Sequence, residues 1–380
     1  MLRQKLLLIY FNISLICMLL VGLELAGQVT FYLWKGYPLY ETDQHLIVAA
    51  DGQLIELHPF LVGRLGADRR ATQGGHSVTS TANHTRWTGA PDWAPVRIAV
   101  VGGSTTFGAG VTDSESWPAR LQALLGPGYA VTNYGMPGYS SAEAVIQMAL
   151  LVPEGRPDVV MFYEGWNDLH NFHDSALGPD YYSHGIRQYS NLDIERPEPT
   201  GLFAKLVEVS AICRLASVTA RQFAARPSAK PPGPAELTSA PDSTPDVFVE
   251  RIYRRNLTTM RLLAVQAGAH VLSVPQVLDA SRYSGDGSSW WTPRIRNSAM
   301  PALLQRMNGI LTESCGNDQA RCTVLDVTAA RSWQPTDFVD EGHFSSAGND
   351  AFARLVAAWV TEATGRDLIP ARPVRAESPP

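Results

Sequence analysis

Several residues of this sequence have the types that nucleophilic catalysis needs. Ser104 stands in GGSTTFG (102–108), directly after an apolar run. Asp340 precedes His343 by three residues in DEGH, near the end of the chain. A serine hydroxyl can attack a carbonyl carbon, a histidine can take its proton, and a carboxylate can orient the imidazole. These residues favour acyl transfer through a serine.

Two further stretches carry groups that can stabilise negative charge on oxygen. NYGMPGYSS (133–141) contains Gly135 and Gly138, which allow backbone N–H groups to point outward. GWND contains Asn167, whose side-chain amide is a donor. Each stretch follows an apolar run of its own, so all three sets of residues stand at ends of predicted strands.

Other uses of a glycine-flanked serine fail on spacing. A phosphate-binding P-loop needs lysine where Ala109 stands. The nucleophile elbow G-x-S-x-G needs glycine where Thr106 stands. The dinucleotide pattern G-x-G-x-x-G does not follow the strand either. The sequence therefore predicts no nucleotide cofactor.

The elements that must position these residues alternate regularly. Short runs rich in Val and Ile predict buried strands, and amphipathic stretches between them predict helices. The predicted strands are 96–102, 129–135, 157–168, 269–275 and 322–327, and the predicted helices are 116–126, 140–155, 246–268, 301–314 and 345–365. This alternation predicts a doubly wound, mostly parallel sheet, which places ligand groups at the carboxyl ends of its strands.

The four stretches GGSTTFG, NYGMPGYSS, GWND and DEGH resemble, in order and spacing, the four blocks of the SGNH (GDSL-like) hydrolase family. The resemblance covers residues 96–363. Gly103 stands where the family often has an acidic residue, and GGSTT occurs in many extracytoplasmic members. The resemblance implies a three-layer α/β/α sandwich with a flavodoxin-like sheet, an esterase activity and no cofactor or metal.

Carried over to this chain, the resemblance implies Ser104 as nucleophile, His343 as general base and Asp340 as its orienting carboxylate. Together with the Ser104 N–H, it implies Gly138 and Asn167 as oxyanion donors. Gly138 is preferred to Gly135 because it lies five residues after Asn133, as in similar sequences.

Neighbouring residues have less specific interpretations. Asp168 suits a structural hydrogen bond to a nearby loop, and Glu341 is the alternative to Asp340. Three histidines and four aromatic residues of nearby loops can contact substrate or simply be surface or packing residues. These residues are His170, His173, His184, Tyr181, Tyr182, Trp290 and Trp291.

The N-terminus predicts an uncleaved membrane anchor over residues 1–35. Arg3 and Lys5 precede an uncharged apolar stretch at 6–23, long enough to cross a bilayer. Residues 25–28 offer only a poor cleavage site. Because the positive residues precede the span, the rest of the chain is expected outside the cytoplasm, in the periplasm or at the cell surface.

The rest of the chain is predicted to contain one catalytic domain, a connecting segment and a tail. Residues 36–95 are predicted to connect the anchor to a hydrolase domain at 96–365. Within that domain, a stretch rich in Pro, Ser and Ala at about 225–246 predicts a mobile insertion. The tail at 366–380 is predicted to be disordered.

The composition argues against nucleic acid and zinc as partners, and it leaves open whether two cysteines form a disulfide. The net charge of −5 gives no reason to expect nucleic acid, and the scattered cysteines do not resemble a zinc site. Cys315 and Cys322 can form a disulfide in an oxidising compartment or remain unpaired thiols.

The sequence as a whole predicts a membrane-anchored serine ester hydrolase. Its expected substrates are short acyl esters, with O-acetyl groups of carbohydrates as the leading class. A lipase or lysophospholipase activity and O-acyl transfer by the same residues are the alternatives. A binding protein that has kept the fold is less favoured, since the serine, histidine and aspartate are all present.

Overall fold

The computed structural model divides into two compact units. One unit combines residues 1–47 with 191–236, and the other combines residues 48–190 with 237–380. The structure describes residues 2–35, 48–49, 52–58, 60–73, 75–175, 177–180, 210–213, 215–216, 241–289, 291–316, 321–366 and 369.

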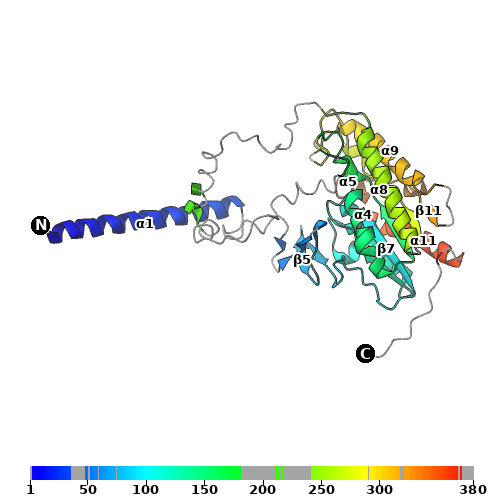
Figure 1. The fold of residues 1–380 in the computed structure, drawn as a ribbon, viewed down its shortest axis with the longest axis horizontal. Coiled ribbons are helices and arrows are strands. Elements are labelled where there is room, and N and C mark those ends of the chain that lie inside the picture. The colour runs from blue at the N-terminus through cyan, green and yellow to red at the C-terminus, as the bar shows by residue number, and fades with distance from the viewer. Residues whose placement is uncertain are drawn as a thin grey trace. The chain divides into compact units, whose positions relative to one another are not determined.

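The first unit is built on one long helix, α1 (Leu2–Lys35), drawn in dark blue in Figure 1. Its stretch Arg3–Leu33 is 31 residues long and contains an 18-residue window with a mean hydropathy of 2.5, which suits a membrane span and equally a signal sequence. Glu24 interrupts the apolar surface of α1. Its carboxylate accepts hydrogen bonds from Ser210 Oγ at 2.7 Å and from the backbone N–H of Ala211 at 2.7 Å.

The second unit contains a five-stranded sheet in the order β11-β10-β9-β7-β8. All neighbouring strands are parallel. Its strands are β7 (Val96–Gly102), β8 (Tyr129–Asn133), β9 (Val159–Tyr163), β10 (His270–Ser273) and β11 (Cys322–Val324). The chain order reverses at β7, which gives the predicted flavodoxin-like topology. All five predicted strands are present and the doubly wound fold is confirmed, but the third strand ends at Tyr163, and residues 166–168, predicted as part of it, are helical.

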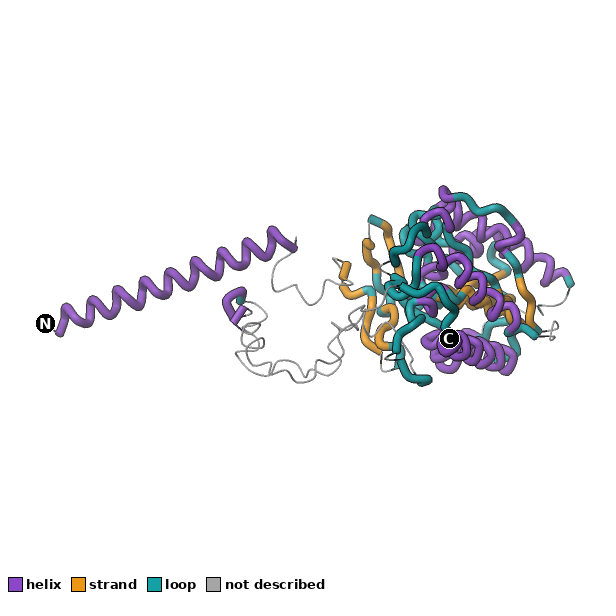
Figure 2. Tube along the Cα trace, turned by 90° about the horizontal axis from the view of Figure 1, so that it is seen from above, coloured by secondary structure: helices purple, strands orange, loops and turns teal. Residues whose placement is uncertain are grey.

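Helices cover both faces of this sheet, as Figures 1 and 2 show. Helices α4 (Ser141–Leu150), α8 (Val247–Gln266) and α9 (Met300–Glu313) share one buried cluster with Val101 of β7. Helices α3 (Trp117–Leu125) and α11 (Ser346–Gly365) share the opposite cluster with Val100. Adjacent residues of β7 thus face opposite layers, as burial on both faces requires.

Short helical turns complete the unit. The α-helical ones are α2 (Ser104–Phe107), α5 (Trp166–Leu169) and α10 (Val327–Ala330), and the 3₁₀ turns are Asp113–Glu115, Val152–Gly155, Ala280–Arg282, Asn297–Ala299 and Pro335–Asp337. α2 and α5 start just beyond the carboxyl ends of β7 and β9. These adjacent strands therefore place Ser104 and Asn167 at one edge of the sheet.

The residues that precede the sheet form three antiparallel two-stranded sheets. Their strands are β1 (Val48–Ala49), β2 (Gly52–Gln53), β3 (Ile55–His58), β4 (Val62–Leu65), β5 (Arg70–Gln73) and β6 (His76–Thr79). The hairpin of β5 and β6 was not predicted from the sequence. Its signal was Gly75, which has a φ of +85° in the turn. Residues 36–47 of the predicted connection lie outside the described residues.

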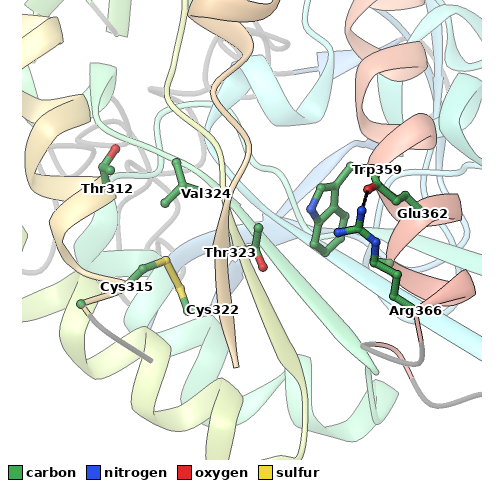
Figure 3. Close-up of a pocket in the computed structure, with 10 residues that line it drawn as sticks. Thr312, Cys315, Cys322, Thr323, Val324, Trp359, Glu362 and Arg366 are labelled. Atoms are coloured by element: carbon green, nitrogen blue, oxygen red, sulfur yellow. Dashed lines mark ion pairs between the residues drawn. A yellow bond between two sulfur atoms is a disulfide. The ribbon is translucent and has the colours of Figure 1, made fainter. Parts of the chain in front are cut away.

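A disulfide joins Cys315, after α9, to Cys322, the first residue of β11. The structure thus favours one of the two states that the sequence left open. The disulfide lies in the wall of a cavity of about 550 Å³, which also holds an ion pair between Arg366 and Glu362 (Figure 3). Most of the predicted insertion at 225–246 and tail at 366–380 lies outside the described residues.

The packing of β10 predicts that alanine substitutions of two leucines differ in their effect on stability. Leu272 in β10 is 0% exposed, whereas Leu262 in α8 is 55% exposed. We expect Leu272→Ala to lower the free energy of unfolding by about 2–5 kcal/mol, because it leaves a cavity in the core. Leu262→Ala, the matched control, should change it by less than about 0.5 kcal/mol. Urea unfolding of the full chain in detergent measures both, and equal effects would contradict the fold.

Candidate active site

The candidate site lies beyond the carboxyl ends of β7 and β9. Ser104 is the first residue of α2, and the preceding Gly103 is packed tightly. A Cβ atom on Gly103 would lie only 2.2 Å from Asn167 Nδ2 and 3.0 Å from the carbonyl oxygen of Tyr139. Glycine at this position therefore lets three chain segments converge on the serine.

A chain of hydrogen bonds links Ser104, His343 and Asp340. His343 Nε2 lies 2.7 Å from Ser104 Oγ, and His343 Nδ1 lies 2.7 Å from Asp340 Oδ2. The second carboxylate oxygen of Asp340 accepts the backbone N–H groups of Gly342 at 3.0 Å and His343 at 2.8 Å. Residues 239 positions apart in the sequence are thus in direct contact, and a proton can pass between serine and imidazole.

Hydrogen bonds and the nearby imidazole favour the charged form of Asp340. Burial by itself would raise the pKa of this carboxyl group, but the hydrogen bond from His343 and the electrostatic attraction of that imidazole lower it. The two backbone N–H groups act in the same direction, and the resulting pKa lies below the usual value. Asp340 therefore remains an acceptor that can fix the orientation of the imidazole.

Gly138 and Asn167 lie in the same cavity as Ser104, His343 and Asp340. Gly138 has a φ of +80°, which favours glycine and shapes the turn before α4. Asn167 Nδ2 donates to the carbonyl oxygen of Tyr139 at 2.6 Å. An amide nitrogen carries two hydrogens, so this bond fixes the side chain and leaves a second donor.

The cavity has a volume of about 220 Å³, and aromatic side chains form much of its wall. Besides the five residues above, its lining residues are Ala109, Pro137, Trp166, Tyr283, Ser289, Trp291 and Glu341.

Trp166 is a site residue to which the sequence assigned no role. Its ring centroid lies 5.3 Å from that of His343. A Cβ atom on Gly342 would lie only 2.5 Å from the indole ring, so glycine allows the DEGH turn to rest against it. Trp166 stands beside Asn167 in GWND, but its contact with a turn more than 170 residues later has no local signal.

The acidic residues next to Asn167 and Asp340, which are Asp168 and Glu341, make different contacts. Asp168 is fully buried and accepts the hydroxyl of Ser141 at 2.5 Å and its backbone N–H at 3.1 Å. The sequence favoured a structural hydrogen bond for Asp168, and its partner is the first residue of α4 instead of a loop residue. Glu341 lines the cavity, but Asp340 makes the contact with His343 Nδ1.

The structure describes some of the loop histidines and aromatic residues that the sequence singled out. His170 Nδ1 contacts the carbonyl oxygen of Trp291, and His173 Nε2 lies 3.1 Å from that of Thr244. Neither histidine lines the cavity, whereas Trp291 does. His184, Tyr181, Tyr182 and Trp290 lie outside the described residues. Within the described residues, no group of three or more His, Cys, Asp or Glu side chains can hold a metal ion.

The profile of the GDSL-like lipase/acylhydrolase family matches residues 100–351. The chain belongs to this family. It is therefore an enzyme of the esterase and acylhydrolase type, as the four sequence blocks predicted. No curated protein matches the chain.

Solved structures of GDSL-like proteins are similar to this chain at low identity. A GDSL-like lipase from Bacteroides thetaiotaomicron is 13% identical over 71% of this chain and 89% of its own, with a TM-score of 0.41. A lipase/acylhydrolase from Enterococcus faecalis is 16% identical over 71% and 96%, with a TM-score of 0.41. An acetyl xylan esterase variant from Geobacillus stearothermophilus is 13% identical over 74% and 98%, with a TM-score of 0.38.

Asp168 predicts a pH dependence of the stability of this acylhydrolase. Burial raises its pKa from 3.8 to about 6, although the bonds from Ser141 oppose the rise. Between these pH values the folded protein binds more protons than the unfolded chain, so the free energy of unfolding falls as pH rises. Asp168→Asn removes this contribution. We expect the stability of the wild type relative to Asp168→Asn to fall from about pH 4 to about pH 7.

Urea unfolding of both proteins across that pH range measures the difference, in which titrating groups that do not interact with Asp168 cancel. A difference that is constant or rises with pH would contradict the buried position of this carboxyl group.

Proposed function

We propose that this enzyme hydrolyses esters through a covalent acyl-serine, with Ser104 as nucleophile, His343 as general base and Asp340 as the residue that orients the imidazole. The observation that carries the proposal is the pair of 2.7 Å contacts made by His343, one to Ser104 Oγ and one to Asp340. A serine next to a base, with that base held by a carboxylate, is the arrangement that activates a hydroxyl group.

In the first half of the reaction, Ser104 Oγ forms a bond to the ester carbonyl carbon while His343 Nε2 takes the hydroxyl proton. The carbonyl oxygen becomes an oxyanion. When the tetrahedral intermediate collapses, the bond to the alkoxy oxygen breaks and His343 returns the proton to the departing alcohol. In the second half, water attacks the acyl-serine in the same way, and the acid and the free serine are released.

The backbone N–H of Ser104, the backbone N–H of Gly138 and the Asn167 amide are the proposed oxyanion donors. The fixed position of the Asn167 amide supports this role, because one N–H is held by the Tyr139 carbonyl oxygen at 2.6 Å. Donors that are fixed in advance act on the charge that develops in the transition state and cost no reorganisation.

We propose short acyl esters, and O-acetyl groups of carbohydrates in particular, as the substrates. The cavity of about 220 Å³ suits a small acyl group better than a long chain. Trp166, Tyr283 and Trp291 line this cavity, and their aromatic rings can make apolar contacts with a sugar ring. Among the described lining residues none is Lys or Arg, so a phosphate group has no cationic partner there. These features favour an acetylated sugar over a lysophospholipid.

We propose that the enzyme works outside the cytoplasm, attached to the membrane by α1. Arg3 and Lys5 precede the apolar stretch of α1, which favours an N-terminus in the cytoplasm. The disulfide between Cys315 and Cys322 supports the same side of the membrane, because disulfides persist in oxidising compartments.

The nucleophile is tested with p-nitrophenyl acetate, butyrate and octanoate, using the full chain in detergent. We expect acetate to be the best of the three, and Ser104→Ala to lower kcat by about 10⁴-fold or more, because it removes the proposed nucleophile. Ser298→Ala, an exposed serine outside the cavity, is the control. Undiminished activity in Ser104→Ala would refute the mechanism. Higher activity on octanoate would refute the substrate class, and acetyl transfer to an added sugar faster than hydrolysis would show a transferase.

Substitution of Asn167 is expected to lower kcat without changing substrate binding. Asn167→Ala removes a donor that acts mainly in the transition state, so kcat should fall by about 10²–10³-fold while KM changes little. Asn167→Asp keeps the shape of the side chain but replaces the donor by an acceptor, and it should lose at least as much. Steady-state kinetics on p-nitrophenyl acetate measures both variants. A rise in KM at constant kcat would assign Asn167 to substrate binding instead.

A further inference from the structure

One arginine from outside the matched family region reaches the turn that follows the candidate nucleophile. The side chain of Arg86 is 0% exposed. Its guanidinium donates to the carbonyl oxygens of Phe107 at 2.7 Å, Gly108 at 2.6 Å and Val111 at 2.8 Å. Its Nε atom pairs with Asp113 at 3.3 Å. A single side chain thus satisfies three backbone carbonyls of one turn.

These carbonyls belong to the turn that fixes Ser104. The helix α2, which begins at Ser104, ends at Phe107. Gly108 has a φ of +86°, and its N–H donates back to the Ser104 carbonyl oxygen at 2.9 Å. Carbonyls at the end of a helix lack partners within it, and a planar guanidinium can bind several of them at once.

The same turn is held by the edge of the sheet. The backbone N–H of Arg86 donates to the carbonyl oxygen of Asn133, the last residue of β8, at 3.1 Å. Asn133 Nδ2 in turn donates to the carbonyl oxygens of Thr106 at 3.2 Å and Phe107 at 3.3 Å. An isolated antiparallel bridge between Arg86 and Asn133 therefore joins the segment around Arg86 to the end of β8, next to α2.

A second contact from the early residues reaches the other side of the site. The hydroxyl of Tyr139, which is 1% exposed, donates to the carbonyl oxygen of Gly63 in β4 at 2.6 Å. Tyr139 follows Gly138 directly, and its own carbonyl oxygen accepts the Asn167 amide. The hairpin of β3 and β4 thus touches the turn that carries one proposed oxyanion donor, Gly138, and that holds another, the Asn167 amide.

We infer that residues 54–88 form a positioning element of the active site, in which Arg86 holds the Ser104 turn and Gly63 holds the Gly138 turn through Tyr139. The inference rests on the proposed function, since it concerns the same serine and the same oxyanion donors. Arg86 does not touch Ser104 Oγ or the cavity, so it is a positioning residue. Without these contacts the serine and the donors lose their alignment, and small displacements of reacting groups slow catalysis strongly.

The main test compares Arg86→Ala and Arg86→Lys with Arg97→Ala in the full chain in detergent. Arg97 is a matched control, because it donates to the carbonyl oxygens of Gly155 and Asp92, near the amino end of β7. On p-nitrophenyl acetate we expect kcat to fall at least ~10-fold in both Arg86 variants, with KM within ~2-fold of the wild type. Arg97→Ala should keep the kcat of the wild type.

Chemical rescue separates positioning from a general loss of structure. Guanidinium ion at low millimolar concentration should fill the space left in Arg86→Ala and raise its kcat several-fold with saturation. It should leave the kcat of Arg97→Ala unchanged. If both alanine variants lose kcat equally, or if a folded Arg86→Ala keeps the kcat of the wild type, the inference is wrong. A folded Arg86→Ala that guanidinium does not rescue also counts against it.

Tyr139→Phe decides the matter if Arg86→Ala does not fold. This variant removes only the hydroxyl bonded to Gly63, and we expect kcat to fall ~3–10-fold at an unchanged KM, with a cooperative thermal unfolding transition at a somewhat lower temperature than that of the wild type. Wild-type kcat in both Tyr139→Phe and Arg86→Lys overturns the inference. Failure of the proposed function is distinct, because Ser104→Ala would then match the wild type whatever the Arg86 variants do.

Discussion

The imidazole of His343 bridges Ser104 and Asp340 with two contacts of 2.7 Å each. In the proposed mechanism both contacts act together, because the carboxylate fixes the ring in the tautomer that can accept the proton of the serine. The partners come from opposite ends of the domain, one after β7 and the other before α11. The parallel sheet and the glycines of the turns hold the imidazole ring in this position.

The parallel sheet meets most of this requirement. Gly102 at the end of β7 pairs with Tyr163 at the end of β9, so the turns that follow them emerge side by side. Close approach then depends on two positions without side chains, since Gly103 faces the Asn167 amide and Gly342 faces the ring of Trp166. Fully buried Asp168 ties the Asn167 turn to the start of α4. Burial and backbone geometry, more than surface charge, therefore determine the shape of the site.

Much of this arrangement could be predicted from the sequence, because it depends on local patterns. The alternation of strands and helices predicts which ends carry Ser104 and Asn167, and the three-residue interval predicts that Asp340 and His343 share a turn. Contacts between distant segments could not be predicted in this way. Nothing near Trp166 indicates that it packs on Gly342, and nothing near Arg86 indicates that it binds carbonyls of the Ser104 turn, since each partner is set by the folded topology. The hairpin of β5 and β6 was missed for a different reason, because its strands are polar and only four residues each.

The central claim is that Ser104 carries the acyl group during turnover. The most direct test mixes the full chain with p-nitrophenyl acetate, quenches the reaction with acid within the first turnover, and maps the acetylated peptide by mass spectrometry. Acid stops the base-dependent attack of water and preserves an acyl-serine. The account predicts one acetyl group on the peptide that contains Ser104, which disappears once the substrate is consumed. An acetyl group on another residue, or turnover with an unmodified Ser104 peptide at every time point, would contradict it.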